Sequence, residues 1–181
     1  AGTAIPGQSV AAPDVLFEGL AGWTPGVHLN ETGKAQAEAL AERLAQAPIK
    51  AIYSSPLERA LETAGPLAQA RKLPVQKCEG IGEVRYGEWT GRSLKVLART
   101  KLWKVVQRQP SAMEFPGGET IRAVQARAVE AVEGIVKRHP KDPVALFSHG
   151  DVIKLRVAYY LGMPLDTFQR VVIGTGSLTV I

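Results

Sequence analysis

The chain has 181 residues, of which 45% are hydrophobic and 22% charged, as expected of a soluble globular protein. Its net charge of +5 and pI of about 9.5 fit an anionic partner, but the basic residues are dispersed, so we expect no nucleic-acid binding. No apolar run could span a bilayer, and the start has no secretory signal. Together with a single cysteine, Cys78, these features predict a cytoplasmic protein without disulfides or a membrane partner.

Metal chemistry is also disfavoured by composition. One cysteine and three scattered histidines do not supply the ligands of a usual zinc site. We therefore expect neither a metal ion nor another cofactor.

The first half of the chain alternates loop, helix and strand. Residues 1–29 are rich in Gly, Pro and Ala and are predicted to be loop. A helix is predicted over 30–47, capped by Asn30 or Thr32, and a short buried strand over 49–55.

The next helix is predicted over 55–72. Ser55 is its expected N-cap and Pro56 its first helical residue, a position that tolerates the missing N–H of proline.

The second half continues the alternation. In chain order we expect a strand and an irregular segment over 73–89, a helix over 91–109, a turn over 115–120, a long helix over 119–139, a strand over 143–149, a helix over 152–161 and a strand over 177–181. Strands that alternate with helices predict an α/β fold with a mostly parallel sheet covered on both faces. We expect one domain over 1–181.

His149 is the first candidate functional residue. In "ALFSHGDVIK", an apolar strand ends at this histidine, and Gly150 and a helical pattern follow. The carboxyl ends of strands line the ligand crevice of an open α/β sheet, so the histidine is placed to bind a ligand or to transfer a proton.

Arg59 and Glu83 are the other two candidates. Arg59 lies in the first turn of its helix, where the macrodipole disfavours a cation unless both face an anion. Glu83 lies between glycines in "GIGEVRYGEW", and a carboxyl beside a phosphate can stay protonated and act as a general acid. Taken singly, Arg59 is explained equally well as a solvated side chain, and Glu83 is better explained as a surface glutamate in a loop.

Five segments that occur in a fixed order along the chain are together specific to one protein family. "LAGWTPGVHLNETGKAQAEALAERL", "SSPLERALETA", "GEVRYGEWTGRSL", "FPGGET" and "FSHGDVIK" resemble the histidine phosphatase superfamily, the phosphoglycerate mutase-like proteins. The resemblance extends from about Gly19 to Ile181 and implies a three-layer α/β/α sandwich.

The resemblance also implies residue roles. His149 corresponds to the second histidine of the phosphate pocket, with Gly150 beside it, Arg59 to the arginine that grips the phosphoryl group, and Glu83 to the proton donor. In that family, the histidine of an Arg-His-Gly motif at the end of the first strand becomes phosphorylated. No Arg-His pair precedes His28 in this sequence.

Two alignments of the first motif remain open. One places residues 7–9 on the Gly-x-Ser end of the motif, so that Ile5 and Pro6 replace the Arg-His pair and Ser9 contacts phosphate.

The other alignment places residues 1–3 just after the nucleophile, with Thr3 near the phosphate. It explains the missing strand and the missing motif by one truncation at the N-terminus, and we favour it.

A basic stretch over 92–108 allows two interpretations. It is predicted to be a solvated helix beside the pocket, and the alternative is a lid that attracts anionic substrates.

The function implied is hydrolysis of a phosphate monoester through a phosphohistidine intermediate, related to the phosphoglycerate mutases. The alternative is a catalytically inactive member of the fold that binds anions or phospho-ligands. We expect the partner to be a small phosphorylated substrate or inorganic phosphate, and a homodimer is one assembly open to the chain.

Overall fold

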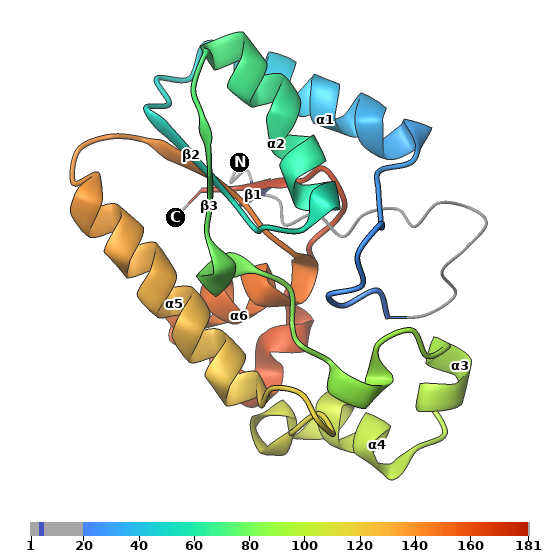
Figure 1. Ribbon diagram of the computed structural model, residues 1–181. Coiled ribbons are helices and arrows are strands. Elements are labelled where there is room, and N and C mark those ends of the chain that lie inside the picture. Colours follow the sequence, from blue (N-terminus) through green and yellow to red (C-terminus); the bar gives the residue numbers. More distant parts are fainter. Residues whose placement is uncertain (1–3, 6–19, 181) are drawn as a thin grey trace.

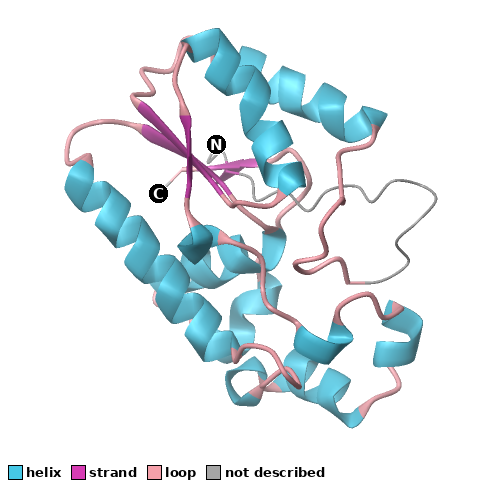
Figure 2. Cartoon of the chain, viewed as in Figure 1, coloured by secondary structure: helices cyan, strands magenta, loops and turns pink. Residues whose placement is uncertain are grey.

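A three-stranded parallel sheet lies at the centre of the fold. The structure is a computed structural model and describes residues 4–5 and 20–180. The strands β2 (Ala51–Ser54), β3 (Val75–Lys77) and β4 (Val144–Phe147) are ordered β3-β2-β4. Ile52 pairs with Val75 on one side and with Ala145 on the other. In Figure 2 the strands cross the middle of the molecule between two groups of helices.

Helices cover both faces of this sheet. The helices α1 (Glu31–Arg43) and α2 (Glu58–Arg71) pack on one face, and α5 (Ile121–Arg138) and α6 (Gly150–Tyr160) lie on the other side (Figure 1). The side chains of β2 alternate accordingly, because successive residues of a strand point to opposite faces. Ile52 packs with Leu67 of α2, and Tyr53 packs on the side of Ile135 of α5. The α/β/α layering implied by the resemblance is confirmed.

A second, antiparallel pair of strands joins the two ends of the chain. The strand β1 (Ala4–Ile5) pairs with β5 (Leu178–Thr179), with Ile5 opposite Leu178. The prediction of loop throughout 1–29 was therefore wrong at these two residues. Strand pairing overrode the local Gly and Pro signals, because it supplies partners that no local pattern reveals.

The start of α2 differs from its prediction. The helix begins at Glu58 with Leu57 as N-cap, so Ser55 is not the cap and Pro56 is not a helical residue. The Ser55 side chain instead contacts His149, as described below. Asn30 does cap α1, since its side chain accepts a hydrogen bond from Gly33 N at 2.8 Å.

The helix predicted over 91–109 is two helices, α3 (Leu94–Leu97) and α4 (Lys101–Arg108). Thr100 separates them, because its side chain accepts a hydrogen bond from Trp103 N at 3.2 Å and so caps α4. The basic side chains of this stretch are exposed, as expected of a solvated surface helix: Arg92, Lys95, Arg99, Lys101, Lys104 and Arg108.

Candidate active site

His149 and Ser55 meet where two neighbouring strands end. Ser55 directly follows β2, and His149 lies between β4 and the first residue of α6 with extended backbone (φ −118°, ψ 154°). Because β2 and β4 are parallel neighbours, their carboxyl ends lie together. Nε2 of His149 is 2.7 Å from Oγ of Ser55, and both residues are fully buried. The serine therefore fixes the orientation of the imidazole ring.

Glu83 lies on the other side of the same ring. Its Oε2 is 3.7 Å from Nδ1 of His149, and its Oε1 accepts a hydrogen bond from Val84 N at 2.8 Å. Burial raises the pKa of Glu83 to about 7, and the negative charge of Asp151 adds to this, while the Val84 N–H bond and Arg59 oppose it. The carboxyl can therefore both donate and accept a proton near neutral pH.

The backbone of Glu83 is held from two directions. Nε1 of Trp23 donates to the carbonyl oxygen of Glu83 at 2.6 Å, and Nη2 of Arg127 donates to the same oxygen at 2.9 Å. Arg127 also donates to the carbonyl oxygens of Gly80 and Gly82, at 2.9 and 3.0 Å. Together these bonds fix the loop that carries the candidate acid.

Arg127 is itself oriented by an ion pair. Its Nε lies 2.7 Å from Oε1 of Glu119, and its Nη2 lies 2.9 Å from Oε2, a bidentate geometry. Sequence reasoning missed this residue, because one arginine in a long amphipathic helix has no local feature that separates it from its solvated neighbours.

Arg59 is the second residue of α2 and is only 3% exposed. Its Nη2 donates to the carbonyl oxygen of Gly22 at 2.8 Å, whereas its buried Nη1 has no hydrogen-bond partner among the described residues. Burial lowers the pKa of this guanidinium, and the charges of Glu83 and Glu58 oppose that shift.

The imidazole of His149 is neutral in this environment. Burial holds the pKa of His149 well below its usual range, and the positive charges of Arg59 and Arg127 lower it further. Its Nδ1 is buried and, like Nη1 of Arg59, lacks a hydrogen-bond partner within the described part of the chain. Buried polar atoms without a hydrogen-bond partner are rare in native folds, and a bound ion is one group that supplies the partner.

The helix α6 adds backbone donors to the same place. Gly150 is its first residue, and no side chain caps this end. The N–H groups of the first turn have no partner within the helix, and the macrodipole favours negative charge there. The sequence also predicted that Thr3 and Ser9 contact phosphate, but these residues lie outside the described part of the chain.

Among the described residues, no group of three or more His, Cys, Asp or Glu side chains is arranged to hold a metal ion. None of the described helices is long and apolar enough to cross a membrane.

Comparison with known proteins identifies the family. A family model described as the histidine phosphatase superfamily (branch 1) matches residues 16–181. The chain belongs to this superfamily. The resemblance inferred from the five sequence segments is confirmed.

Two relatives of this chain are named as phosphatases. It is 32% identical over 158 residues to phosphoserine phosphatase 1 of Hydrogenobacter thermophilus, covering 84% of this chain and 74% of the relative. It is 32% identical over 148 residues to glucosyl-3-phosphoglycerate phosphatase of Mycolicibacterium vanbaalenii, covering 77% of this chain and 66% of the relative.

Solved structures agree. The chain superposes on Bacillus stearothermophilus YhfR with a TM-score of 0.82 at 31% identity, covering 88% of this chain and 79% of the other. Mycobacterial glucosyl-3-phosphoglycerate phosphatase gives a TM-score of 0.78 at 26% identity, covering 94% and 83%. The chain therefore has the phosphoglycerate mutase-like fold.

Proposed function

We propose that this protein is a phosphate-monoester hydrolase whose pocket holds the phosphoryl group against Arg59, His149 and the first turn of α6. The proposal rests on two buried nitrogen atoms, Nη1 of Arg59 and Nδ1 of His149, that have no hydrogen-bond partner among the described residues. Nδ1 belongs to the residue before α6, whose N-terminus no side chain caps. A phosphoryl oxygen is an acceptor suited to a guanidinium and to backbone N–H groups.

The proposed chemistry has two steps. An imidazole nitrogen attacks phosphorus, so that a P–N bond forms and the P–O bond to the alcohol breaks, while Glu83 gives its proton to the leaving oxygen. Water then attacks phosphorus, the P–N bond breaks, and Glu83 takes the water proton. Arg59 and the neutral His149 stabilise the transferring group in both steps.

This two-step scheme does not assign the attacking histidine to a residue of the printed sequence. The family resemblance assigns it to an Arg-His-Gly motif that has no counterpart before His28. His28 itself pairs with the carboxylate of Glu62, and Nε2 of His139 lies 3.0 Å from the Tyr53 hydroxyl. A phospho-ligand-binding member of the fold without turnover stays the alternative prediction.

The substrate class follows from the relatives. Phosphoserine and glucosyl-3-phosphoglycerate, the compounds in the relatives' names, are both small phosphorylated acids with a carboxylate besides the phosphate. We propose a substrate of the same class for this protein, and retain a single domain, a cytoplasmic location and a homodimer as predictions. Light scattering on the purified protein tests the last of these.

Anion binding is the direct test of the pocket. Calorimetric titration with vanadate or inorganic phosphate should show one site in the unmodified chain. Arg59→Ala should lower the affinity at least tenfold, and Arg59→Lys should not fully restore it, because the planar fork is lost. Arg71→Ala, at the other end of α2, is the matched control and should bind as the unmodified chain does. Unchanged affinity in Arg59→Ala would remove Arg59 from the site.

Turnover separates the two candidate functions. Release of phosphate from phosphoserine, 3-phosphoglycerate and nucleotides should be screened together with acid-labile labelling of the protein. Hydrolysis with a labelled histidine supports the phosphatase, and tight binding without either signal supports the binding module.

A further inference from the structure

The loop of residues 22–29 is attached to the first two turns of α2. Within it, Gly26 makes a tight turn with a φ of +74°. Gly26 N donates to Oε1 of Glu58 at 3.2 Å, and Leu29 N donates to Oε2 of Glu62 at 2.8 Å. In Figure 1 the segment that leads into α1 passes beside the start of α2. Two carboxylates of one helix therefore hold the far end of this loop.

The near end of the same loop contacts the candidate active site. The carbonyl oxygen of Gly22 accepts a hydrogen bond from Nη2 of Arg59 at 2.8 Å, and Nε1 of Trp23 donates to the carbonyl oxygen of Glu83 at 2.6 Å. Arg59 is itself a residue of α2, so the helix and the loop fix its guanidinium between them. A displacement of the loop would therefore move groups that hold both the guanidinium and the candidate acid.

His28 makes one attachment of the loop depend on charge. Its Nδ1 pairs with Oε1 of Glu62, the carboxylate whose other oxygen accepts from Leu29 N. This hydrogen bond and the negative charge of Glu62 raise the pKa of His28 above its ordinary value of 6.5; desolvation opposes the shift, and Glu58 adds to it. The stabilisation from the pair is thus fully present below pH 6.5 and is lost as the pH rises through the raised pKa of His28.

The charged groups that act on this pair come from α1 and α2. Besides Glu62, Glu58 acts on the imidazole, and Lys34, which pairs with Glu31 at 2.7 Å, acts on the carboxylate of Glu62. Side-chain exposure is 59% for His28 and 36% for Glu62. Exposed ion pairs contribute little, so loss of the pair should change the anion affinity by about threefold.

We infer that Glu62 is a positioning residue for the phosphate pocket. Through Leu29 N and protonated His28 it fixes the loop, and the loop in turn fixes the groups that bind phosphate. The inference rests on the proposed function, since it takes Arg59 as the residue that grips the phosphoryl group. The anion affinity of the pocket then depends on the protonation of a histidine that is not a pocket residue.

Sulfate is a suitable probe, because it keeps its double negative charge near neutral pH. Glu83 also titrates in this range, so Glu83→Gln serves as the reference protein. Its sulfate affinity, measured by calorimetry from about pH 5.5 to pH 8.5, should fall about threefold as His28 loses its proton. Adding His28→Gln should remove this fall and leave the affinity near the high-pH value throughout.

Two substitutions of Glu62 separate its charge from its hydrogen bonding. Glu62→Gln keeps an oxygen for Leu29 N but removes the charge, so its affinity should match the high-pH value of the reference at every pH. Glu62→Ala removes both contacts and should lower the affinity at least fivefold. A merely structural role would lower the melting temperature without changing the pH profile.

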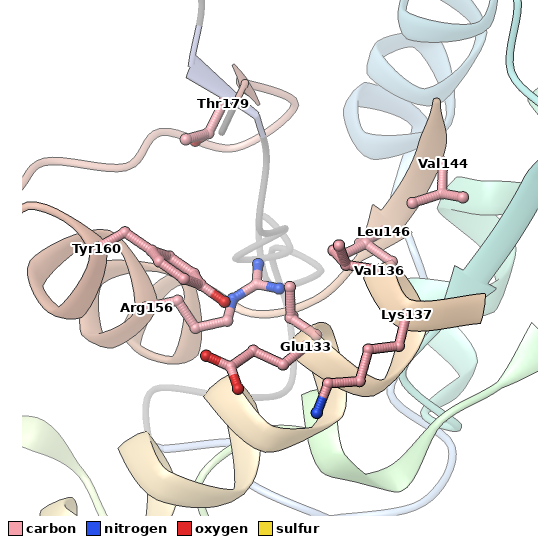
Figure 3. A pocket seen from close by; sticks show the side chains of 9 residues that line it. Glu133, Val136, Lys137, Val144, Leu146, Arg156, Tyr160 and Thr179 are labelled. Atoms are coloured by element: carbon pink, nitrogen blue, oxygen red, sulfur yellow. The ribbon is translucent and has the colours of Figure 1, made fainter. Parts of the chain in front are cut away.

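Glu133→Gln is the matched control, because it removes a carboxylate from α5 on the other side of the sheet. Figure 3 shows Glu133 beside a cavity whose described lining residues include none of the 22–29 loop. This variant should bind sulfate as the reference does, at every pH.

The inference is overturned if the affinity of the reference does not depend on pH, if His28→Gln leaves the fall intact, or if Glu133→Gln has the effect of Glu62→Gln. Arg59→Ala distinguishes this failure from a failure of the proposed function. Loss of sulfate binding in Arg59→Ala, with Glu62 variants that bind as the reference does, would overturn this inference alone. Unchanged binding in Arg59→Ala would overturn both.

Discussion

Nδ1 of His149 lies 3.7 Å from Oε2 of Glu83 at the carboxyl end of the parallel sheet. The imidazole is fully buried and neutral, and the carboxyl has a pKa raised to about 7. The pair therefore offers a hydrogen-bonding group that carries no charge and, next to it, an acid that exchanges a proton near neutral pH. This combination suits the protonation of a leaving alcohol beside a phosphoryl group.

The raised pKa of Glu83 predicts a pH-dependent stability. The folded protein binds a proton at Glu83 that the unfolded chain has lost above its ordinary pKa, so this contribution is fully present below about pH 4.5 and is lost as the pH rises to about 7. A shift of this size corresponds to about 3 kcal/mol. Urea unfolding measured from pH 4 to pH 8 should show the decline.

Glu83→Gln is the matched comparison for that measurement. The variant keeps the shape of the side chain but cannot titrate, so its unfolding free energy should depend less steeply on pH over the same range. Parallel curves for the two proteins would contradict the assignment of a raised pKa to this carboxyl.

Ser55→Ala should weaken anion binding through His149. The variant removes the oxygen that lies 2.7 Å from Nε2, and it leaves this buried nitrogen without a partner. The expected cost is about 1–3 kcal/mol of unfolding free energy, together with a several-fold loss of vanadate affinity as the ring loses its fixed orientation. Denaturation and calorimetry measure the two effects.

Ser148→Ala is the control for Ser55→Ala. Ser148 is equally buried, but its hydroxyl donates to the carbonyl oxygen of Ile81 at 2.7 Å and not to the imidazole. It should cost similar stability with little change in vanadate affinity. Equal affinity losses in both variants would mean that Ser55 acts only through stability.

Arg127→Met should destabilise the loop that carries Glu83. The variant leaves Glu119 without its ion-pair partner and removes three bonds to backbone carbonyls, at an expected cost of about 3–5 kcal/mol. Adding Glu119→Gln should recover part of the loss, because no unpaired carboxylate remains. A double-mutant cycle of unfolding free energies measures this coupling, and strict additivity would argue against it.

Gly87→Ala should be severe, because two backbone segments meet there. Gly87 has a φ of +54°, and a Cβ at this position would lie 2.1 Å from the carbonyl oxygen of Pro116. Gly91 has a φ of +78° with nothing within 4 Å of its would-be Cβ. Gly91→Ala should therefore lower the free energy of unfolding by about 1–2 kcal/mol, because alanine is strained in the left-handed backbone conformation. Gly87→Ala should lower it clearly more. Thermal denaturation of the two variants makes the comparison.

Two variants decide how the first motif aligns. If residues 7–9 form the end of the motif, Ile5→Arg with Pro6→His should create a chain that forms acid-labile phosphohistidine. If residues 1–3 do, an apolar strand ending in Arg-His must be added ahead of Ala1 to give the same label.

The unmodified chain is the reference for both variants. A polypeptide that truly begins at Ala1 should show no labelled histidine and almost no turnover, since covalent catalysis needs an attacking atom in line with the leaving oxygen. Robust hydrolysis by that polypeptide without a labelled histidine would require another nucleophile and would overturn the phosphohistidine mechanism.

The sequence by itself determined the elements whose causes are local. The alternation of apolar strands and amphipathic helices predicted a mostly parallel sheet covered on both faces. Asn30 was one of two predicted caps, because its partner, Gly33, is three residues away. The strand that leads to His149 could be predicted for the same reason, since an apolar run followed by Gly150 and a helical pattern is a feature of neighbouring residues.

Only the tertiary structure decided the partners of the site residues. Ser55 was expected to cap a helix, but the parallel pairing of β2 and β4 brings it to His149. Its hydroxyl therefore hydrogen-bonds the imidazole. Arg127 could not be distinguished from surface arginines until packing placed it against the carbonyl oxygen of Glu83. The neutral state of His149 has the same origin, because burial and the charges of distant residues set a pKa, and both arise only when the chain has folded.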